Sequence, residues 1–475
     1  MKRIIALILA TILLMSASFA LTSCGGGKKP APDFVMPEGG LDENAEITIT
    51  FYHEFGQERE KILTSTIEDF NKIYPNITIN PVKYDKYDVI LEKVKKEITV
   101  GAGPNLAICY PDHVGTYNLS GAVQTLDVFM TDSEVGFTAE QLADFIPAFL
   151  EEGKNFGDGK TYTLPISKST EVLYYNKTFF EKHNLTVPTT WEEMEAVCRQ
   201  IKAIDPDCIP LGYDSEANLF ITLCEQYGSP YTSATKGQEF LFDNDKNKEF
   251  MSMFRTWFQD KLMTTQGLNG GAYTSKMFTG EGAKEGNTTR CYMCIGSTGG
   301  ATYQRPQYTT VNGQDVFEFE VGINPIPQAN KNNQKVILQG PSVCVFKKAD
   351  PQQVLASWLF AKYLSTDPFF QGSISMNNGY CPVIKSVDNL PAYAEFLAGA
   401  STKNIQALAI QATRLQQNYF YSSPAFYGSS DARLQVEGLV TECLSASLDG
   451  KTVKEKFDEI FAKKVRACKT AIGQK

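Results

Sequence analysis

The stretch Glu46-Ile-Thr-Ile-Thr-Phe-Tyr52 alternates polar and apolar residues, and a helical pattern from Glu58 to Tyr74 follows it directly. A period of two followed by a period near 3.6 predicts a strand, a loop and a helix. The same order then repeats, with a strand, a helix and a third strand predicted at Ile77–Lys83, Tyr87–Thr99 and Asn105–Tyr110. Strands that alternate with helices predict a parallel sheet with both faces covered.

The loops after these three strands are candidate ligand contacts. In open α/β sheets, ligands gather at the carboxyl ends of the strands. The chain places Tyr52–Phe55, Tyr84–Tyr87 and Pro111–Gly115 there. Sugars present apolar ring faces and rings of hydroxyl groups, so aromatic and polar side chains in such loops fit a carbohydrate site.

A second series of elements begins with an extended run from Thr161 to Asn176. Thr190 and Glu193 form a capping-box pattern at the start of a helix that begins at Trp191. Further strands are expected at 290–295, 317–326 and 336–346. Further helices are expected at 177–183, 219–227, 248–261, 351–364, 368–375, 392–397, 404–418, 431–448 and 453–468.

The amino terminus carries a secretory pattern. Lys2 and Arg3 precede an apolar run from Ile4 to Met15, which is too short to span a bilayer. Leu-Thr-Ser-Cys24 resembles the lipobox of bacterial lipoproteins, in which the cysteine is acylated and becomes the first residue. This resemblance implies a signal peptide at 1–23, lipidation of Cys24 and a tether at 24–45. Several acyl chains on one residue give stable anchoring.

Composition limits the remaining function classes. The formal net charge is −9, and removal of the first 23 residues makes it more negative, which argues against nucleic acid as a partner. The length predicts two or three domains, and no later segment has the roughly 18 apolar residues of a membrane span. Ten further cysteines are mostly scattered singly, and Cys291 and Cys294 lie in an apolar, strand-like run. We expect these cysteines to be core residues, although the sequence does not decide whether any pair oxidises.

Seven motifs in order resemble the extracellular solute-binding proteins of carbohydrate ABC importers, in particular the maltose-type and glycerol-3-phosphate-type binders. The resemblance spans about residues 46–465. The motifs are Phe51-Tyr52-His53, Asn71-x-x-Tyr74-Pro75-x-Ile77, Leu164-Pro165 through Asn176-Lys177, Pro188 to Glu193, Ile295-Gly296-Ser297, Val321-Gly322-x-x-Pro325-x-Pro327 and Asn378-Gly-Tyr380-x-Pro382.

The resemblance implies an α/β fold of two lobes, the type II periplasmic-binding-protein-like fold, with the ligand in the interlobe cleft. Lobe one would comprise 46–165 and 327–365, and lobe two 170–320 and 370–475. The hinges would lie near 164–169, 323–327 and 365–370. Paired crossings of this kind let two lobes close as rigid bodies.

The resemblance also implies a set of ligand contacts. Its aromatic members are Tyr52, Tyr87, Tyr380 and Tyr427, its small and hydroxyl members are Ser169, Ser297 and Gly340, and its remaining members are His53, Asp112, His113 and Arg433. Gly340 would let the backbone approach the ligand closely. Phosphate-binding relatives carry an arginine near the start of the segment aligned with Phe426–Ser429, whereas the nearest arginine here is Arg433.

That departure favours a neutral mono- or oligosaccharide over glycerol-3-phosphate or a glycerophosphodiester, because a dianionic group needs a fixed cation or a fork of donors. No catalytic or metal motif and no cofactor is expected. A glycan-active enzyme and an adhesin stay open as alternatives. The family implies permease subunits and an ATPase as partners. We expect a monomer at the outer face of the cytoplasmic membrane or in the periplasm.

Overall fold

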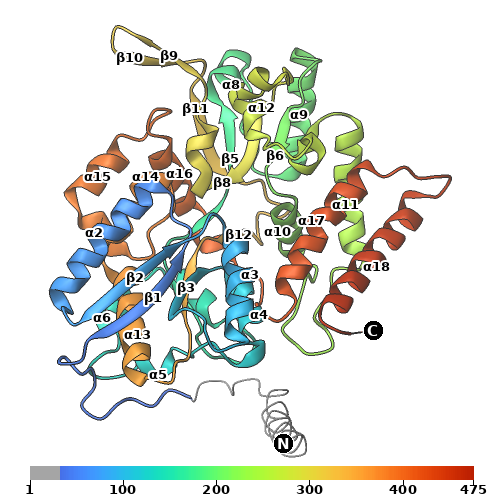
Figure 1. Ribbon diagram of the computed structural model, residues 1–475. Helices are drawn as coiled ribbons and strands as arrows, with labels where there is room; N and C mark the ends of the chain where they lie inside the picture. The colour runs from blue at the N-terminus through green and yellow to red at the C-terminus, as the bar shows by residue number, and fades with distance from the viewer. Residues whose placement is uncertain (1–32, 475) are drawn as a thin grey trace, which may run out of the picture.

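The structure is a computed structural model that describes residues 33–474. The predicted signal peptide at 1–23 and the predicted lipidation site at Cys24 lie outside the described residues. Figure 1 shows two α/β bodies, one built around β1, β2 and β3 and the other around β5, β6 and β8, with α17 and α18 beside the second. The prediction of a two-lobe α/β chain is confirmed.

The sheet of the first lobe has the strand order β2-β1-β3-β13-β4. Its first three strands pair in parallel, and β13 runs antiparallel to both β3 and β4. The strands are β1 (Ile47–His53), β2 (Ile77–Lys83), β3 (Leu106–Cys109), β4 (Leu164–Pro165) and β13 (Ser342–Val345). The helices are α2 (Gln57–Ile73), α3 (Tyr87–Ile98), α4 (Pro111–Tyr117), α5 (Asp127–Met130), α6 (Ala139–Asp144), α7 (Pro147–Glu151), α13 (Pro351–Thr366), α14 (Pro368–Asn378) and α15 (Pro391–Ala398).

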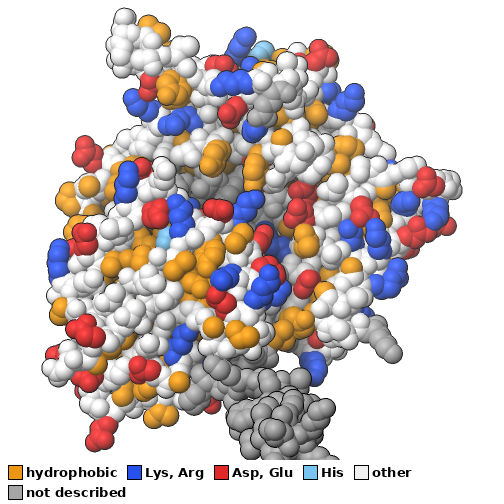
Figure 2. Space-filling view, viewed as in Figure 1, with side chains coloured by type: hydrophobic (Ala, Val, Ile, Leu, Met, Phe, Trp, Pro, Cys, Tyr) orange, Lys and Arg blue, Asp and Glu red, His pale blue; other side chains and the backbone are white. Residues whose placement is uncertain are grey.

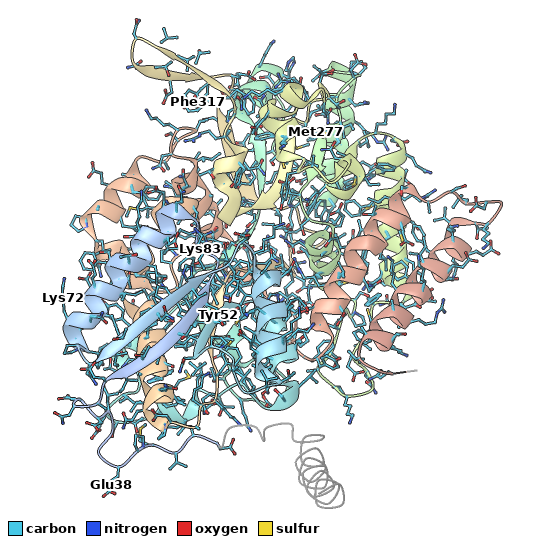
Figure 3. The ribbon with its side chains drawn as sticks, in the orientation of Figure 1. Glu38, Tyr52, Lys72, Lys83, Met277 and Phe317 are labelled. Atoms are coloured by element: carbon cyan, nitrogen blue, oxygen red, sulfur yellow. The ribbon has the colours of Figure 1, made fainter. Side chains whose placement is uncertain are left out.

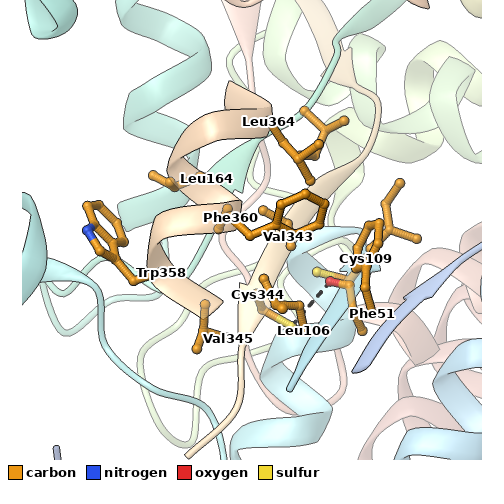
Figure 4. Packing of buried hydrophobic residues seen from close by; sticks show 14 of the residues in the cluster. Phe51, Leu106, Cys109, Leu164, Val343, Cys344, Val345, Trp358, Phe360 and Leu364 are labelled. Carbon is orange, nitrogen blue, oxygen red and sulfur yellow. Dashed lines mark hydrogen bonds between the residues drawn. The ribbon is translucent and has the colours of Figure 1, made fainter. Parts of the chain in front are cut away.

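The core of this lobe follows from the two periods in the opening sequence. Alternate residues of β1, among them Phe51, are buried, and α2 buries Phe70 on the face that its helical spacing selects. Both rings pack against Phe360 of α13, at centroid distances of 5.8 and 5.1 Å. Figure 4 shows Phe51 and Phe360 in this core. Each such buried side chain contributes about 1.5–3 kcal/mol, so the alternation fixes which face of the strand turns inward.

The second sheet has the order β14-β12-β5-β8-β6-β7, and β11 also pairs with β5. Its strands are β5 (Ser169–Asn176), β6 (Leu211–Tyr213), β7 (Met263–Thr265), β8 (Met293–Ser297), β11 (Val321–Pro325), β12 (Val336–Gln339) and β14 (Phe420–Tyr421). The helices around it are α8 (Lys177–His183), α9 (Trp191–Ile204), α10 (Glu216–Gln226), α11 (Asp245–Gln259), α12 (Ser275–Thr279), α16 (Ile405–Leu415), α17 (Ser429–Ser445) and α18 (Val453–Ala471). The predicted capping box of α9 is present, with Thr190 accepting from the Glu193 backbone N–H at 3.2 Å.

Short 3-10 helices join several of these elements: η1 (Asn118–Ser120), η2 (Glu152–Lys154), η3 (Gly267–Asn269), η4 (Glu281–Glu285), η5 (Thr298–Gln304), η6 (Lys385–Asn389) and η7 (Gln417–Tyr419). A hairpin of β9 (Tyr308–Val311) and β10 (Gln314–Phe317) was not predicted. It projects from the second lobe, as Phe317 in Figure 3 shows. Its side chains are mostly exposed, so it has no buried face to produce an apolar alternation.

The chain passes between the sheets at 166–168, from β4 to β5, and at 340–341, from β12 to β13. The first crossing lies inside the expected hinge 164–169. The expected hinge 323–327 differs, because this Pro-punctuated stretch is mostly β11, paired with β5. The expected hinge 365–370 differs too, because α14 and α15 belong to the core of the first lobe, and the third passage lies between α15 and α16.

Two lobe boundaries therefore differ from the expectation. Phe370, Ile374 and Tyr393 pack in the first core although 370–475 was assigned to the second lobe. Val336 and Ile337 pack in the second core although 327–365 was assigned to the first. Both differences have the same physical reason, since apolar helix and strand faces join the nearest core and composition does not reveal which core that is.

The described part of the expected tether is packed rather than free. Phe34, Met36 and Leu41 lie against the first core, and the Phe34 ring is 4.5 Å from that of Phe129. Lys347 pairs with Asp33 at 2.6 Å. The prediction of a tether through residue 45 is therefore wrong for this part, because these apolar side chains find a surface on lobe one.

The ten cysteines of the described residues are all buried and unpaired, as expected for core residues. Among residues 33–474, no group of three or more His, Cys, Asp or Glu side chains could hold a metal ion. No helix in the same range is long and apolar enough to cross a membrane.

Candidate functional site: the cleft between the lobes

A cavity of about 670 Å³ lies between the two lobes. Figure 2 shows a recess at this place, with acidic and basic side chains around it. Lobe one contributes Tyr110, Asp112 and Glu152 to the wall, and lobe two contributes residues of β5, the loop after β6, α10, α12, η5 and α17. The wall therefore draws on both lobes, so the position of one relative to the other sets its shape.

Six of the eleven predicted contact residues line this cavity: Asp112, Ser169, Ser297, Gly340, Tyr380 and Arg433. They come from α4, the start of β5, the end of β8, the second crossing, the loop after α14 and α17. The structure thus brings together residues that are more than 300 positions apart in the chain. That they contact a ligand stays a prediction.

Gly340 occupies a position that a side chain could not share. Its φ is +106°, and a Cβ built on it would lie 2.5 Å from the carbonyl oxygen of Ser167 on the other crossing. L-residues with a side chain rarely adopt this φ. The two crossings therefore run at backbone contact here, directly beside the cavity.

Two of the predicted residues on β1 do not line the cavity. Tyr52 donates from its hydroxyl to Glu97 of α3 at 3.0 Å, and Figure 3 places it at the sheet of the first lobe. His53 is buried and accepts from the Phe55 backbone N–H at 3.3 Å. Burial lowers the pKa of His53 to about 4, so the ring is neutral at physiological pH.

Three more predicted residues lie away from the wall. His113 is buried on the inner side of α4 between Tyr110 and Tyr117, with ring centroids 5.5 and 6.5 Å away. Tyr427 donates to the carbonyl oxygen of Ala471 at 3.2 Å, at the end of α18. Tyr87 reaches the cavity only indirectly, since its ring lies 4.5 Å from Tyr110, which is part of the wall.

A hydrogen-bonded network holds Arg433 at the second lobe. The guanidinium donates to Asn218 Oδ1, and Asn218 Nδ2 donates to Glu171 at 2.9 Å and to Gln339 at 2.7 Å. The Tyr213 hydroxyl also donates to Glu171. Burial raises the pKa of the Glu171 carboxyl to about 7, and these donors and the Arg433 charge oppose the rise.

Asp214 is a second acid at the wall, and it is fully occupied by donors. It follows β6 and accepts from the Thr274 backbone N–H at 2.6 Å, from the Thr274 hydroxyl at 2.7 Å and from Gln304 Nε2 at 3.1 Å. Burial nevertheless raises the pKa of its carboxyl. Asp214 therefore fixes the loop before α12 and the side chain of Gln304.

Glu152 and Lys168 form a buried ion pair beside the cavity. The side chains are 4% and 0% exposed, and Glu152 belongs to the wall. Burial raises the pKa of the Glu152 carboxyl, and the Lys168 ammonium opposes that rise. A buried ion pair needs further hydrogen bonds to offset its desolvation, and Lys168 Nζ donates to the Gly340 carbonyl at 3.1 Å and to Ser342 Oγ at 2.9 Å.

The wall also carries polar atoms that have no partner within the described residues. They are the hydroxyls of Tyr231, Thr232 and Ser423 and the Oε1 atom of Gln304. Two aromatic side chains of the wall, Tyr273 and Tyr303, are 55% and 76% exposed. Buried polar groups without a partner are costly, so these atoms can receive hydrogen bonds from a polar molecule while exposed rings offer flat faces for stacking.

Sequence reasoning missed several wall residues. Asp214 could have been found, because it follows β6, and the carboxyl ends of parallel strands were already the expected place. Glu171 stands as an acid in an otherwise apolar run of β5, which is also a usable signal. Glu152 carries no such signal, since it begins a short 3-10 helix among other polar residues.

Residues 65–398 match a family model described as bacterial extracellular solute-binding protein. A curated relative, the sn-glycerol-3-phosphate-binding periplasmic protein UgpB of Yersinia pestis, is 25% identical over 343 residues, which cover 70% of this chain and 74% of the relative.

Two solved structures extend the likeness to the whole fold. The sugar-binding protein MalE from Xanthomonas citri has a TM-score of 0.69 at 17% identity, with 89% of this chain and 98% of that chain covered. UgpB from Mycobacterium tuberculosis, in complex with glycerophosphocholine, has a TM-score of 0.67 at 16% identity, with 90% and 99% covered. At these identities the likeness establishes the fold alone.

Proposed function

This chain belongs to the bacterial extracellular solute-binding protein family, and we propose that it is the substrate-binding component of an ABC importer, which captures a carbohydrate between its lobes. The observation that carries the proposal is the cavity of about 670 Å³, whose wall is divided between the two lobes. A ligand that contacts both lobes stabilises the closed form by its differential affinity for that form. The closed complex would then deliver the ligand to a permease served by an ATPase.

The chemistry of the wall supports a carbohydrate. Amide and hydroxyl side chains such as Gln304, Thr232 and Ser297 can pair with ligand hydroxyls, and the rings of Tyr303 and Tyr380 can cover apolar ring faces. The volume lies within the range of about 300–1,000 Å³ that is usual for small-molecule sites. It fits a mono- or oligosaccharide.

The charges of the wall favour a neutral ligand. Among the described residues that line the cavity, five carry carboxyl groups, namely Asp112, Glu152, Glu171, Asp214 and Glu281, and two are basic, namely Lys276 and Arg433. An excess of acids opposes a phosphate dianion, which needs fixed cations or a fork of donors. A neutral sugar is therefore our first candidate.

Glycerol-3-phosphate or a glycerophosphodiester is the second candidate. Arg433 and Lys276 both line the cavity, so cationic groups are present. The relatives named UgpB bind glycerol-3-phosphate or glycerophosphocholine by their descriptions. Arg433, however, already donates to Asn218, and the acids outnumber the two cations.

We also propose that the mature chain is a monomer, anchored to the membrane by acyl chains on Cys24. The proposal rests on the lipobox-like Leu-Thr-Ser-Cys24 after an apolar segment. Two or three chains on one residue would hold the protein at the membrane surface stably. The packed segment from Phe34 onward would then place lobe one nearest the anchor.

A thermal-shift and calorimetry panel on residues 25–475 tests the ligand class. It contains maltose, longer oligosaccharides, common monosaccharides and glycerol-3-phosphate. A ligand at about 100 times its dissociation constant adds about 2.7 kcal/mol to the free energy of unfolding. A shift with a neutral sugar supports the first candidate, and a shift with glycerol-3-phosphate alone supports the second. The absence of any shift across an extended panel of sugars and phosphodiesters would contradict both.

A further inference from the structure

Lys168 lies at the point where the crossings of the chain meet, and no part of it is exposed. It stands in the first crossing, between β4 and β5, immediately before Ser169. Its position in the interior is unusual, because lysine is almost never fully buried unless it is paired.

The ammonium of Lys168 uses its three donors on three different groups. It pairs with the Glu152 carboxylate of η2, and it donates to the carbonyl oxygen of Gly340 at 3.1 Å and to Ser342 Oγ at 2.9 Å. Glu152 belongs to lobe one, Gly340 to the second crossing, and Ser342 to the start of β13, where that crossing enters lobe one. An ammonium has three N–H donors, so this set saturates it.

The backbone of Lys168 holds a further segment. Its N–H donates to the Cys381 carbonyl at 3.0 Å, and its carbonyl accepts from the Cys381 N–H at 2.6 Å. Cys381 belongs to the segment that follows α14. One residue therefore joins both crossings, the η2 turn and this segment.

Four residues of the cavity wall either bond to Lys168 or stand next in the chain to Lys168 or to one of its partners. Glu152 and Gly340 bond to its ammonium, Ser169 follows it in the chain, and Tyr380 precedes Cys381. The ammonium thus holds Glu152 and Gly340 directly, and the backbone of the same residue holds Ser169 and, through Cys381, Tyr380.

We propose that Lys168 is the positioning residue of the ligand site, which fixes the wall formed by Glu152, Ser169, Gly340 and Tyr380 without touching the ligand itself. The inference rests on the proposed function, because that function identifies the wall as a ligand site. The contacts of Lys168 with the two crossings do not depend on it. An apolar side chain could fill the same volume, yet only a saturated cation ties these segments to one geometry.

Two variants separate positioning from stabilisation. Lys168→Met keeps an unbranched side chain, one atom shorter than that of lysine, and leaves Glu152 buried without its partner, which is strongly destabilising. Glu152→Gln/Lys168→Met removes both charges and relieves that cost. Lys464→Met is the matched control, because Lys464 is also a largely buried lysine, paired with Glu442 at 2.8 Å between α17 and α18, and neither residue lines the cavity.

We expect Lys168→Met to weaken binding of the best sugar probe from the panel by about tenfold or more, as for loss of a charged hydrogen-bond partner. The double variant should recover thermal stability but not affinity. Lys464→Met should change stability and leave affinity at the wild-type value. Recovery of wild-type affinity in the double variant would overturn the proposal, since a merely structural ion pair predicts that affinity returns with stability.

Hydrogen exchange on the unliganded protein supplies a second readout that needs no ligand. We expect faster exchange of the amides at 338–342 and 380–382 in Lys168→Met and in the double variant, but not in Lys464→Met. Wild-type exchange at both segments in the double variant would refute the positioning role. If no probe binds the wild-type protein, the carbohydrate assignment fails, and the exchange result alone still decides the role of Lys168.

Discussion

The backbone of Phe426 lies directly against Gly115: a Cβ built on Gly115 would be 2.4 Å from the Phe426 carbonyl oxygen. Gly115 belongs to α4 of lobe one, and Phe426 precedes α17 of lobe two. Asp112 and Ser429, each three residues from this contact, both line the cavity. The two lobes therefore approach each other at backbone distance beside the site.

Replacing Gly115 with alanine should hold the lobes apart. Alanine is the better helix former, so the change costs nothing locally, but its methyl group cannot share the space of the Phe426 backbone. We expect a larger radius of gyration by X-ray scattering and weaker ligand binding. Gly56→Ala is the control, because a Cβ there meets nothing within 4 Å. An unchanged affinity and radius in Gly115→Ala would show that this contact does not limit closure.

The charge of Arg433 distinguishes the two candidate ligands. Arg433→Gln removes a cation from the wall and weakens its donation to Asn218. For a neutral sugar we expect affinity to fall by about tenfold or less, because one hydrogen bond contributes about 0.5–1.5 kcal/mol. For an anionic ligand the loss should exceed about a hundredfold. Isothermal titration calorimetry with a sugar and with glycerol-3-phosphate measures the difference.

The stability of the protein should depend on pH through Glu171. Its carboxyl has a pKa of about 7 in the folded protein against an ordinary value of 4.5, so the folded protein holds this proton more tightly than the unfolded chain does. The contribution of Glu171 to the free energy of unfolding therefore falls as pH rises from about 4.5 to about 7 and is constant above that. Since one pKa unit corresponds to about 1.4 kcal/mol, Glu171→Gln should gain on the order of 3 kcal/mol relative to wild type across this window.

Urea unfolding at several pH values checks this prediction, with Glu193→Gln as the contrasting variant. Hydrogen bonds from Thr189 lower the pKa of Glu193 to about 2, so the free energy of unfolding depends on pH through Glu193 with the opposite sign to that of Glu171. The contribution of Glu193 is present above about pH 4.5 and is lost as pH falls toward 2. A constant difference between Glu171→Gln and wild type from pH 4.5 to 7 would contradict the raised pKa.

Tyr303 should matter more for oligosaccharides than for monosaccharides. Its ring lines the cavity yet is 76% exposed, so it can stack only on a sugar unit that extends beyond the enclosed part. Tyr303→Ala should weaken oligosaccharide binding by about tenfold, since aromatic stacking contributes about 0.5–1.5 kcal/mol beyond area burial, and should leave monosaccharide binding nearly unchanged. Tyr308→Ala is the control, because Tyr308 is 51% exposed on the β9–β10 hairpin outside the wall. Equal losses for short and long sugars would contradict this role.

The anchoring proposal has its own test. Cys24→Ser in the full chain should release the protein from the membrane fraction, because serine offers no thiol for acylation. Mass spectrometry of the amino-terminal peptide should show acyl groups on Cys24 in the wild-type chain. An unmodified Cys24 in the membrane-derived protein would refute lipidation.

Much of the fold could be predicted because its helices and strands produce recognisable patterns in short stretches of sequence. The alternation in β1 and the helical spacing in α2 depend only on which side chains face the core, and both elements lie within a residue or two of their predicted bounds. The capping box of α9 is equally local. Assignment of elements to lobes was less accurate, because the apolar pattern of Phe370 and Ile374 predicts burial but not which core buries them.

The site could be predicted only where chain geometry and residue type agree. Ser297 and Gly340 lie where strands end or cross, so the motif and the fold point to the same place. Tyr52 has the right residue type at the end of a strand, but its side chain turns to Glu97. Sequence alone does not show which way such a side chain points, because its partner is 45 residues away. Lys168 was missed for the same reason, since its role lies entirely in distant partners.

Ten buried thiols have a practical consequence for studying lobe motion. Burial raises the pKa of most of these cysteines, among them Cys294 and Cys443, so the reactive thiolate is scarce and shielded from reagents. A chain that starts at residue 25 and carries two added surface cysteines, one on each lobe, should therefore accept maleimide dyes at those two places first. Fluorescence energy transfer could then follow each opening and closing event in single molecules without removing any native cysteine.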